Sequence, residues 1–504
     1  MQSPKICLTL TGKTIKENLD LVHRYRPYVD LLELRADFLD EDESLHIRKF
    51  PELARIPCIL TIRRRVDGGK YVAGEGSRTM LFARAMAFAD DQNPERNFQY
   101  VDFEEDFHVP SLQDAALAFG TKIIRSFHSM NEPVHDIIKR CDSMRKTGYE
   151  IPKIAFMPKT LDDVKNLFYE TRDFTKYEHI LCAMGPMGIA SRILAYKTHS
   201  FLTYTSADVE GNELKTIGHI DPIMMNQVYH FKDLNDKTKI FGITGWPLLK
   251  TDSPLLHNQG YVNHFMNAVY IPIPSAEIQQ AIEFANEIGV RGMSVTVPHK
   301  ESVLHELFEL DSRAREISAA NTIVRKNDKW CGYNTDCTGF ANALLEWTGL
   351  KNLRHKRISV IGAGGASRAV AYAIKMLGGK ACVFNRTPLR AKAVADMFGF
   401  EYALLSADSV PLIEKYSDII VQTTSVGMNS TESSNSQNDP LSFYHWTGRE
   451  LVFDIIYTPR VTPMMERAAA AGCKVCNGES MLKYQGYEQF KIFTGVDYEE
   501  AKPK

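Results

Sequence analysis

The sequence predicts an α/β protein in which an N-terminal (β/α)8 barrel is followed by a small α/β domain and a Rossmann domain that binds a dinucleotide. Three observations predict this class. Eight apolar, β-rich runs alternate with helical segments in about the first 230 residues, and a glycine-rich turn at 362–365 joins a strand to a helix. The length of 504 residues is enough for about three domains.

The composition is that of an ordinary globular enzyme, with 44% hydrophobic and 24% charged residues. The net charge is −2 and no basic block occurs, so nothing favours nucleic acid as a partner. The nine cysteines give no disulfide framework, and Cys473 and Cys476 are interpreted as part of a strand, so we expect no metal site. No signal or transmembrane segment is visible, which predicts a cytoplasmic protein without membrane contact.

The first half is predicted to be the barrel because strand and helix patterns repeat eight times. Helical periodicity separates the strands, as at Leu161–Thr171 and Ser191–Tyr196. Active sites of such barrels lie at the carboxyl ends of the strands, and polar residues gather there. The predicted strands are Lys5–Thr11, Asp30–Asp37, Cys58–Arg64, Tyr100–Glu105, Lys122–His128, Ile151–Met157, His179–Gly185 and Phe201–Ser206. The polar residues are Glu33, Arg35, Arg63, Glu104, His128, Lys153 and Arg192.

Lys153 is the most informative residue of this half, because its strand is apolar enough to be buried on both faces. Desolvation lowers the pKa of a buried lysine toward a neutral, nucleophilic amine. The alternative is a lysine that extends from the strand start to water. His128 on the neighbouring strand favours chemistry, since a histidine beside an amine can carry protons during imine formation. A core histidine bonded to backbone is the alternative for His128.

The stretch Ile358–Arg390 predicts one βαβ unit of a dinucleotide-binding sheet. Gly362 permits the tight turn and Gly364 lets the backbone approach a pyrophosphate. The helix that follows offers its N-terminal N–H groups to that anion. The third fingerprint position is Ser367, which is small but is not glycine.

The end of the second strand of this unit decides between NAD and NADP. An NAD site needs an acidic residue there for the ribose hydroxyl, whereas this chain has Asn385-Arg386-Thr387, with Arg390 one turn later. Two guanidinium groups and a hydroxyl suit a 2′-phosphate. The alternative is a pair of arginines that only solvate a helix start. The sequence therefore predicts NADP.

The small α/β domain contains a second lysine with a possible acidic partner. Lys300 precedes a predicted helix, Glu301–Leu310, whose N-terminus should lower the pKa of the lysine. Asp336 is a possible partner that would restrain this shift; taken singly, each residue is more often a solvated charge than a catalytic group. The predicted strands of this domain are Ile240–Thr244, Ala268–Pro272, Met293–Val297 and Thr322–Arg325.

Five motifs of the first half occur in the order and at the spacings of one known family. They are Glu33-Leu-Arg35, Arg63 with Asp67-Gly-Gly69, Ser126-Phe-His128, Pro152-Lys153-Ile154-Ala155 and Met184-Gly-Pro-Met-Gly-Ile-Ala-Ser-Arg192. Together they resemble type I 3-dehydroquinate dehydratase over roughly residues 5–230. The resemblance implies that Lys153 forms a Schiff base with the substrate ketone. It also implies that His128 takes part in proton transfer and in the loss of water.

The same resemblance implies substrate contacts. Glu33 and Arg35 would hold ring hydroxyls, Arg63 would line the pocket, and Arg192 would bind the carboxylate. Two positions depart from the family pattern. Asp67 replaces a glutamate, and Lys215-Thr-Ile-Gly-His219 replaces a loop that usually reads Ser-Ala-Pro-Gly-Gln. His219 is expected to offer another donor to the substrate.

A longer series of motifs in the second half resembles shikimate dehydrogenase over roughly residues 238–504. The series is Gly242-Ile-Thr-Gly245, Ser253-Pro254, His257-Asn258, Val297-Pro-His-Lys300, Ala320-Asn-Thr322, Asn334-Thr-Asp336, Gly362-Ala-Gly-Gly-Ala366, Asn385-Arg-Thr387, Thr423-Thr-Ser425 and Gln485. The resemblance implies that Lys300 and Asp336 form the catalytic pair. Asn321, Thr296 and Gln485 would then bind substrate hydroxyls. The expected cofactor contacts are Gly362, Ala363, Gly364, Gly365, Ala366, Asn385, Arg386, Thr387, Arg390 and Thr423.

One departure in this half concerns the substrate carboxylate. The family's substrate loop carries Ser-x-Ser, and the corresponding positions here are Leu249 and Thr251. Thr251 keeps a hydroxyl, whereas Leu249 has none. We therefore expect the carboxylate to receive one hydrogen bond fewer than in the family.

The order of the two halves resembles the fused dehydroquinate dehydratase–shikimate dehydrogenase family, in which the product of the first activity is the substrate of the second. The predicted borders are 1–232 for the barrel, 238–342 for the substrate domain and 343–479 for the NADP domain, with the C-terminal helix, 480–504, returning to the substrate domain. Two alternatives remain: a dehydrogenase whose barrel is an impaired binding module, and a dehydrogenase for quinate or a related polyol acid.

Overall fold

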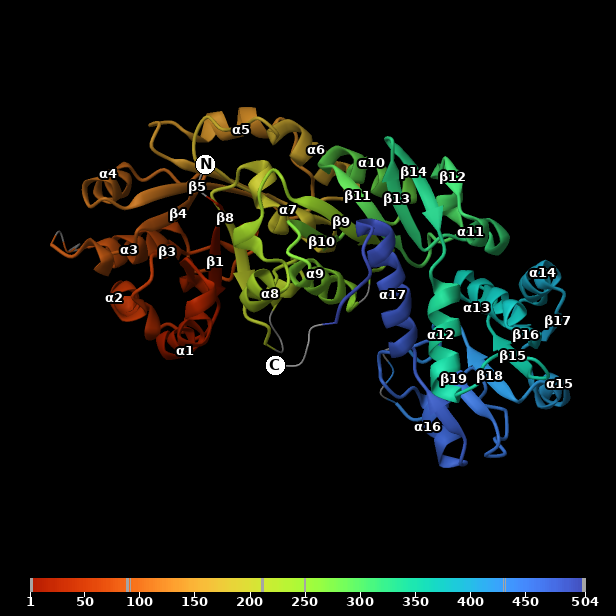
Figure 1. Cartoon of the computed structure of the whole chain (residues 1–504). Coiled ribbons are helices and arrows are strands. Elements are labelled where there is room, and N and C mark those ends of the chain that lie inside the picture. The colour runs from red at the N-terminus through yellow and green to blue at the C-terminus, as the bar shows by residue number, and fades with distance from the viewer. Residues whose placement is uncertain are drawn as a thin grey trace. The chain divides into compact units, whose positions relative to one another are not determined.

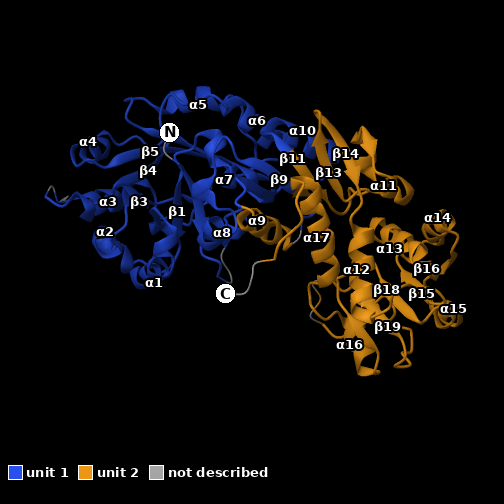
Figure 2. Ribbon diagram, in the orientation of Figure 1, with its two compact units in different colours: residues 1–242, 247–250, 265–290 blue, residues 243–246, 251–264, 291–504 orange. Residues whose placement is uncertain are grey.

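The computed structural model describes residues 3–87, 90, 92–209, 213–248, 251–428, 430 and 432–500. By its internal contacts the chain divides into two compact units (Figures 1 and 2). The first contains residues 1–242, 247–250 and 265–290, and the second contains residues 243–246, 251–264 and 291–504. The three predicted domain borders remain a prediction.

The first unit contains the predicted barrel. Its eight strands are parallel neighbours in the order β7-β6-β5-β4-β3-β2-β1-β8. The backbone N–H of Phe201 donates to the carbonyl of His179 at 2.7 Å, which brings the start of β8 next to β7 and nearly closes the sheet. All eight predicted strands are confirmed: β1 Lys5–Leu10, β2 Leu31–Arg35, β3 Cys58–Thr61, β4 Tyr100–Glu104, β5 Lys122–Ser129, β6 Ile151–Phe156, β7 Ile180–Ala183 and β8 Leu202–Ser206.

Helices connect these strands, as the alternating pattern predicts. The helix at Leu161–Thr171 begins at a capping box, in which Thr160 and Asp163 each accept a backbone N–H of the other. The predicted helix at Ser191–Tyr196 is corrected to a helix that ends at Ile193, followed by a 3₁₀ turn. The helices of this unit are α1 Ile15–Tyr25, α2 Phe50–Ala54, α3 Glu75–Met86, α4 Pro110–Ala118, α5 Ile137–Met144, α6 Leu161–Thr171, α7 Ile189–Ile193, α8 Pro222–Gln227 and α10 Ile278–Ile288; β10 is Ala268–Pro272.

The interior of the barrel is apolar at one end and polar at the other. One apolar cluster consists largely of residues at or near the beginnings of the strands, such as Leu31, Ile151, Ile180 and Leu202. This apolar layer fills the amino-terminal end of the barrel. Polar groups are therefore confined to the carboxyl-terminal end, where active sites of such barrels lie.

The second unit contains two sheets. In the first of them, β11, β13, β14 and β12 are neighbours in that order. The second has the strand order β17-β16-β15-β18-β19-β20, and all its pairs are parallel. In sequence terms this order is 3-2-1-4-5-6, the order of a Rossmann fold. The glycine turn after β15 lies where the order reverses, which is where such folds bind ligands.

The predicted helix Glu301–Leu310 is wrong. A 3₁₀ segment occupies Ser302–Glu306, and β12 follows at Glu309–Leu310. The strand forms because its residues pair with β14, where Glu309 lies opposite Cys331. Lys300 therefore does not lie at the N-terminus of an α-helix.

The C-terminal helix α17 is shorter than the segment 480–504 and ends at Thr494. It packs against α9 and α12, and a Cβ at Gly339 would lie 2.7 Å from the Cβ of Gln485, so only glycine permits this approach.

None of the helices in the described part of the chain has the length and apolar content that crossing a bilayer requires. The remaining strands are β9 Lys239–Thr244, which crosses the unit border, β11 Val290–Val295, β12 Glu309–Leu310, β13 Thr322–Lys326, β14 Lys329–Tyr333, β15 Arg357–Ile361, β16 Lys380–Asn385, β17 Glu401–Leu404, β18 Ile419–Gln422, β19 Leu451–Asp454 and β20 Lys474–Cys476. The remaining helices are α9 Ser253–Asn263, α11 Ser312–Ile317, α12 Asp336–Thr348, α13 Gly365–Met376, α14 Pro388–Phe398, α15 Val410–Lys415, α16 Pro463–Ala470 and α17 Glu479–Thr494.

Candidate active sites

A cavity at the carboxyl end of the barrel gathers all the site residues predicted for the first half. Its walls also contain Thr9, Met130, Tyr204, Leu214 and Ile217, which the sequence did not single out. The predicted residues that line the cavity are Glu33, Arg35, Arg63, Asp67, His128, Lys153, Arg192 and His219.

Lys153 lies inside this cavity on β6, and its side chain is 6% exposed. Its Nζ donates to Asp102 Oδ2 at 2.8 Å and lies 3.5 Å from Glu33 Oε1. The amine also lies 4.2 Å from the centre of the Tyr204 ring, whose face attracts a cation. The lysine is therefore not directed to water: burial opposes its charge, and two carboxylates favour it.

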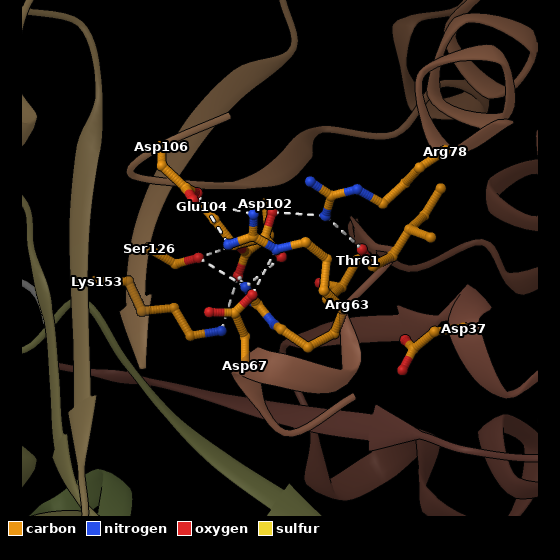
Figure 3. Close-up of polar contacts among 12 residues, drawn as sticks. Asp37, Thr61, Arg63, Asp67, Arg78, Asp102, Glu104, Asp106, Ser126 and Lys153 are labelled. Atoms are coloured by element: carbon orange, nitrogen blue, oxygen red, sulfur yellow. Dashed lines mark hydrogen bonds and ion pairs between the residues drawn. The ribbon is translucent and has the colours of Figure 1, made fainter. Parts of the chain in front are cut away.

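A chain of buried ion pairs extends from Lys153 across β4, β3 and α3 (Figure 3). Asp102 pairs with Arg63 Nη2 at 2.8 Å, and Arg63 Nη1 pairs with Glu104 at 2.9 Å. Glu104 in turn accepts from Arg78 Nη1 at 2.6 Å, and Arg78 is fully buried. Charges of opposite sign alternate along this series of ion pairs, so each buried charge in it has a partner.

Asp102 and Arg78 are the functional candidates that sequence reasoning missed. A signal for Asp102 was present, since the strand Tyr-Val-Asp-Phe-Glu places Asp102 and Glu104 two residues apart and therefore on one face. Two acids on one face of a buried strand require cations opposite them. Arg78 gave no comparable signal, because it lies on a helix whose apolar periodicity is weak.

Glu33 and Arg35 occupy the carboxyl end of β2 and are held by neighbours. Glu33 accepts from Thr9 Oγ1 at 2.9 Å and from Thr61 Oγ1 at 3.0 Å. Arg35 forms a bidentate pair with Asp37 at 2.9 and 2.7 Å. These contacts fix the two side chains before substrate enters, as a preformed hydroxyl-binding site requires.

Two half-buried histidines face the cavity. Burial first, and then the charges of Arg63 and Lys153, hold the pKa of His128 well below its usual range. Burial and the charge of Arg192 do the same for the pKa of His219. Both imidazoles are therefore neutral near pH 7, and a neutral imidazole can accept a proton.

Backbone carbonyls hold the guanidinium of Arg192, on α7, through its two Nη atoms. Its Nη2 donates to the carbonyl of Ile217 at 2.8 Å, and its Nη1 lies 3.4 Å from that of Tyr204. Its buried Nε has no hydrogen-bond partner within the described residues. The loop Lys215–His219, which departs from the family pattern, supplies Ile217 and His219 to the cavity wall, and Leu214 just before it also lines the cavity. Asp67 also lines the cavity and accepts from Arg64 Nε at 2.6 Å.

The second unit brings together a second lysine and carboxylate. Lys300 Nζ donates to Asp336 Oδ2 at 2.6 Å, and the two side chains are 15% and 7% exposed. Asn321 Nδ2 donates to Asp336 Oδ1 at 2.9 Å and lies 3.3 Å from Gln485 Oε1. One connected group therefore contains the predicted residues Lys300 in the loop after β11, Asn321 just before β13, Asp336 on α12 and Gln485 on α17.

A further set of hydrogen bonds, centred on Gln489, supports this group and was not predicted from the sequence. Gln489, one turn after Gln485, donates to Thr322 Oγ1 at 2.9 Å and accepts from Ser294 Oγ at 2.8 Å. It also donates to the Asn321 carbonyl at 3.2 Å. These bonds tie α17 to β11 and β13, so the C-terminal helix fixes the amide of Asn321.

The other predicted substrate residues of this unit lie in the loops after β9 and β11. Thr251 Oγ1 donates to Ser253 Oγ at 3.1 Å and accepts the Ser253 N–H at 3.2 Å. The backbone N–H of Thr296 donates to the Thr244 carbonyl at 2.9 Å. Leu249 lies outside the described residues, so the hydrogen bond that we expect to be lost there stays a prediction.

The glycine turn after β15 has the shape that a dinucleotide requires. Gly362 has φ +115°, and a Cβ there would lie 2.5 Å from Thr423 Oγ1. Gly364 is the N-cap of α13, and a Cβ there would meet no atom within 4 Å, so its backbone faces open space. Thr423 Oγ1 donates to the Ile361 carbonyl at 2.7 Å and supports the turn from β18.

The same turn lies against Lys300. A Cβ at Gly365 would lie 3.2 Å from the Cβ of Lys300. Ala363 and Ala366 flank these glycines and complete the predicted turn. The dinucleotide loop and the Lys300–Asp336 pair are therefore neighbours, as hydride transfer between a cofactor and a substrate requires.

The end of β16 presents the residues that were predicted to select NADP. Arg386, Thr387 and Arg390 are exposed, and Asn385 Nδ2 donates to the Thr387 carbonyl at 3.1 Å. No acidic side chain occupies the segment between Asn385 and Arg390. This chemistry fits a 2′-phosphate and lacks the carboxylate that a ribose hydroxyl would need.

Comparison with known proteins supports both halves. Residues 6–236 match the family described as Type I 3-dehydroquinase. Residues 243–323 match the Shikimate dehydrogenase substrate binding domain, and residues 345–468 match the Shikimate / quinate 5-dehydrogenase family.

Two relatives match almost the whole chain. One is the chloroplastic bifunctional 3-dehydroquinate dehydratase/shikimate dehydrogenase of Arabidopsis thaliana, 32% identical over 93% of this chain and 78% of the relative. The other is the shikimate biosynthesis protein AroDE of Chlamydia pneumoniae, 27% identical over 97% and 95%. The NADP(+) shikimate dehydrogenase of Pyrococcus abyssi matches the second half, with 36% identity over 51% of this chain and 93% of the relative.

Proposed function

The chain belongs to the family of bifunctional 3-dehydroquinate dehydratase/shikimate dehydrogenases, and on that premise we propose how its two sites divide the work. The barrel converts 3-dehydroquinate to 3-dehydroshikimate, and the second unit reduces 3-dehydroshikimate to shikimate. Both are steps of the shikimate pathway, and both substrates are small molecules.

In the barrel, we propose that Lys153 forms a Schiff base with the substrate ketone. The observation that supports this role is the position of its amine, which lies inside the cavity and is surrounded by Asp102, Glu33 and Tyr204. The protonated imine withdraws electrons and acidifies the adjacent C–H. His128, neutral because of its lowered pKa, takes that proton and takes part in the departure of water.

The remaining polar groups of the barrel cavity hold the substrate. Glu33 and Arg35 bind ring hydroxyls, and Arg192 offers its Nε to the carboxylate. Arg63, Asp67 and His219 line the same cavity and complete the polar wall. Elimination requires the ring to be held with the breaking bonds aligned, and such positioning contributes much of the rate.

In the second unit, we propose that Lys300 gives a proton to the carbonyl oxygen that is being reduced. Asp336 holds its ammonium at 2.6 Å, and Asn321 fixes Asp336 from the other oxygen. Asn321, Thr296 and Gln485 bind substrate hydroxyls, and Thr251 binds the carboxylate. Lys300 is the cation of this cluster, so the proton-donor role falls to it.

A nicotinamide dinucleotide supplies the hydride when it is bound, and we propose that the dinucleotide is NADP. Gly362, Gly364 and the N-terminus of α13 would hold the pyrophosphate. Arg386, Thr387 and Arg390 would hold the 2′-phosphate. The other contacts of this turn are Ala363, Gly365, Ala366, Asn385 and Thr423.

A coupled assay tests the whole proposal. Purified chain supplied with 3-dehydroquinate and NADPH should oxidise NADPH and release shikimate, and borohydride added with 3-dehydroquinate alone should stop turnover. Oxidation of NADPH from 3-dehydroshikimate but not from 3-dehydroquinate would show that the barrel does not catalyse dehydration. A cytoplasmic location and the absence of a nucleic-acid partner stay predictions.

A further inference from the structure

Asp102 is a buried acid at the reacting end of the barrel that has no assigned role. It lies on β4, its side chain is 0% exposed, and both of its oxygens are engaged (Figure 3). Oδ2 accepts from Lys153 Nζ at 2.8 Å and pairs with Arg63 Nη2 at 2.8 Å. Oδ1 accepts from Ser126 Oγ at 2.5 Å. Asp102 is therefore the carboxylate nearest to the proposed nucleophile, ahead of Glu33 at 3.5 Å.

The charge balance of imine formation shows what such a carboxylate can do. In the net reaction, R–NH3⁺ and a ketone give R–NH⁺=C and water, so the Lys153 nitrogen carries one positive charge both before the covalent step and after it. A buried cation without a partner is strongly disfavoured, because burial removes its hydration. The nitrogen of Lys153 therefore needs the same counterion before and after the covalent step.

The surroundings of Asp102 keep it ionised, so it is a fixed negative charge and a poor base. Burial raises its pKa, but the charges of Arg63 and Lys153 outweigh burial and hold the pKa well below the usual range. A proton that leaves Lys153 on the way to the imine goes to a group that can accept one. His128, whose pKa burial lowers, is such a group beside the same cavity.

We propose that Asp102 is the counterion of the protonated imine on Lys153, with Arg63 and Ser126 holding its carboxylate in place. The proposal rests on the proposed function of Lys153 as the Schiff-base residue. Glu33 is less suited to this role, because its nearest oxygen lies 3.5 Å from Lys153 Nζ, compared with 2.8 Å for Asp102.

The test is the substitution Asp102→Asn, which keeps the shape and removes the charge. The rate of dehydration should fall roughly 10²–10³-fold, the usual effect of removing one group that stabilises charge in a reaction. The imine should also lose its proton more readily without its counterion. The high-pH limit of borohydride trapping should therefore move down by about one to three pH units.

Glu104→Gln is the matched control. Glu104 lies two residues away on the same face of β4 and pairs with Arg63, but it does not contact Lys153. A merely structural disturbance of the ion-pair chain should lower the rate in Glu104→Gln as well, without moving the pH limit of trapping. Shikimate dehydrogenase activity and thermal unfolding of each variant report whether the chain is folded.

The outcomes separate this proposal from the proposed function beneath it. If borohydride traps nothing in the parent chain, the Schiff-base role of Lys153 is wrong. If the parent is trapped and Asp102→Asn is trapped with the same pH limit, the counterion role is wrong and the role of Lys153 stands. If Asp102→Asn does not fold, Asp102→Glu retains the charge and should keep the parent pH limit at a lower rate; a limit moved down in that variant contradicts the proposal.

Discussion

The two active sites each contain a lysine paired with an aspartate, and the two pairs have similar geometry. The Nζ-to-carboxylate distance is 2.8 Å for Lys153 and Asp102 and 2.6 Å for Lys300 and Asp336. Their surroundings differ. The first pair continues into a buried chain of arginines and carboxylates, whereas the second is joined to the amide of Asn321. A lysine–aspartate pair alone therefore does not define a chemistry.

The neighbours decide which task each lysine can perform. A nucleophilic amine needs a nearby group that removes its proton, and the barrel provides neutral His128 in the same cavity. A proton donor needs to stay protonated and to lie beside the reducing cofactor, and Lys300 lies against the dinucleotide loop at Gly365. The following predictions test this division.

The largest effect is expected for Lys153→Ala. It removes the proposed covalent nucleophile, so dehydratase turnover should fall by roughly 10⁴-fold or more. The reduction of 3-dehydroshikimate by the same protein should be unchanged, which controls for folding of the second unit. Dehydration at the parent rate would mean that the Schiff-base mechanism is wrong.

The converse substitution, Lys300→Ala, should lower the kcat for reduction of 3-dehydroshikimate by about 10²–10⁴-fold, the range for removing a general acid. Dehydratase turnover in the same preparation should stay at the parent level. Steady-state kinetics with 3-dehydroshikimate separates an effect on kcat from an effect on KM. A change confined to KM would assign Lys300 to binding instead of proton transfer.

The two units should also respond differently to acid. In the barrel, His128 and His219 have pKa values well below the 6.5 of an unfolded histidine. Between these values the unfolded chain binds more protons, so stability falls as the pH falls below 6.5. Each histidine contributes at most about 1.4 kcal/mol per pH unit, a limit approached once the pH is well below 6.5.

In the second unit two buried groups have opposite effects on how stability changes with pH. Burial lowers the pKa of His257 to about 3, which makes acid destabilising between pH 6.5 and 3. Burial raises the pKa of Asp454 to about 7, so the folded state binds the extra proton between pH 3.8 and 7 and acid is stabilising there. Hydrogen exchange at pH 6 and pH 5 should therefore show β1–β8 weakened and β15–β19 nearly unchanged. Equal weakening of both sheets would contradict this account.

The smallest effect concerns the cofactor. Arg386→Ala removes one guanidinium from the exposed end of β16, and a charged hydrogen bond contributes about 1.5–3 kcal/mol. NADP affinity should therefore fall roughly 10–150-fold, with little change for NAD. Titration of the two dinucleotides by fluorescence measures the ratio. Equal losses would mean that Arg386 has a structural role.

Much of both sites could be predicted from the sequence, because their residues lie at the ends of strands whose patterns are strong. All eight barrel strands follow from apolar runs, and six of the seven polar residues that the sequence placed at or beyond their ends line the cavity. The seventh, Glu104, instead pairs with Arg63 and Arg78. The partners of those residues were harder to find. Asp102 contacts a residue 51 positions away, and such a contact depends on strand neighbours that periodicity does not identify.

The helix predicted at Glu301–Leu310 shows a second limit of prediction from the sequence. Its residues have helical periodicity, but the backbone N–H of Phe308 donates to the Trp330 carbonyl at 2.9 Å and Glu309–Leu310 pairs with β14. Tertiary pairing with a strand therefore overrode the local preference.

The central claim is that two similar lysine–aspartate pairs perform different chemistry, and covalent trapping tests it most directly. The chain is treated with borohydride and 3-dehydroquinate, and the modified lysine is located by peptide mass spectrometry. The account predicts one adduct per chain, on Lys153, and none on Lys300. An adduct on Lys300, or an unmodified Lys153 in a chain that still dehydrates 3-dehydroquinate, would contradict it.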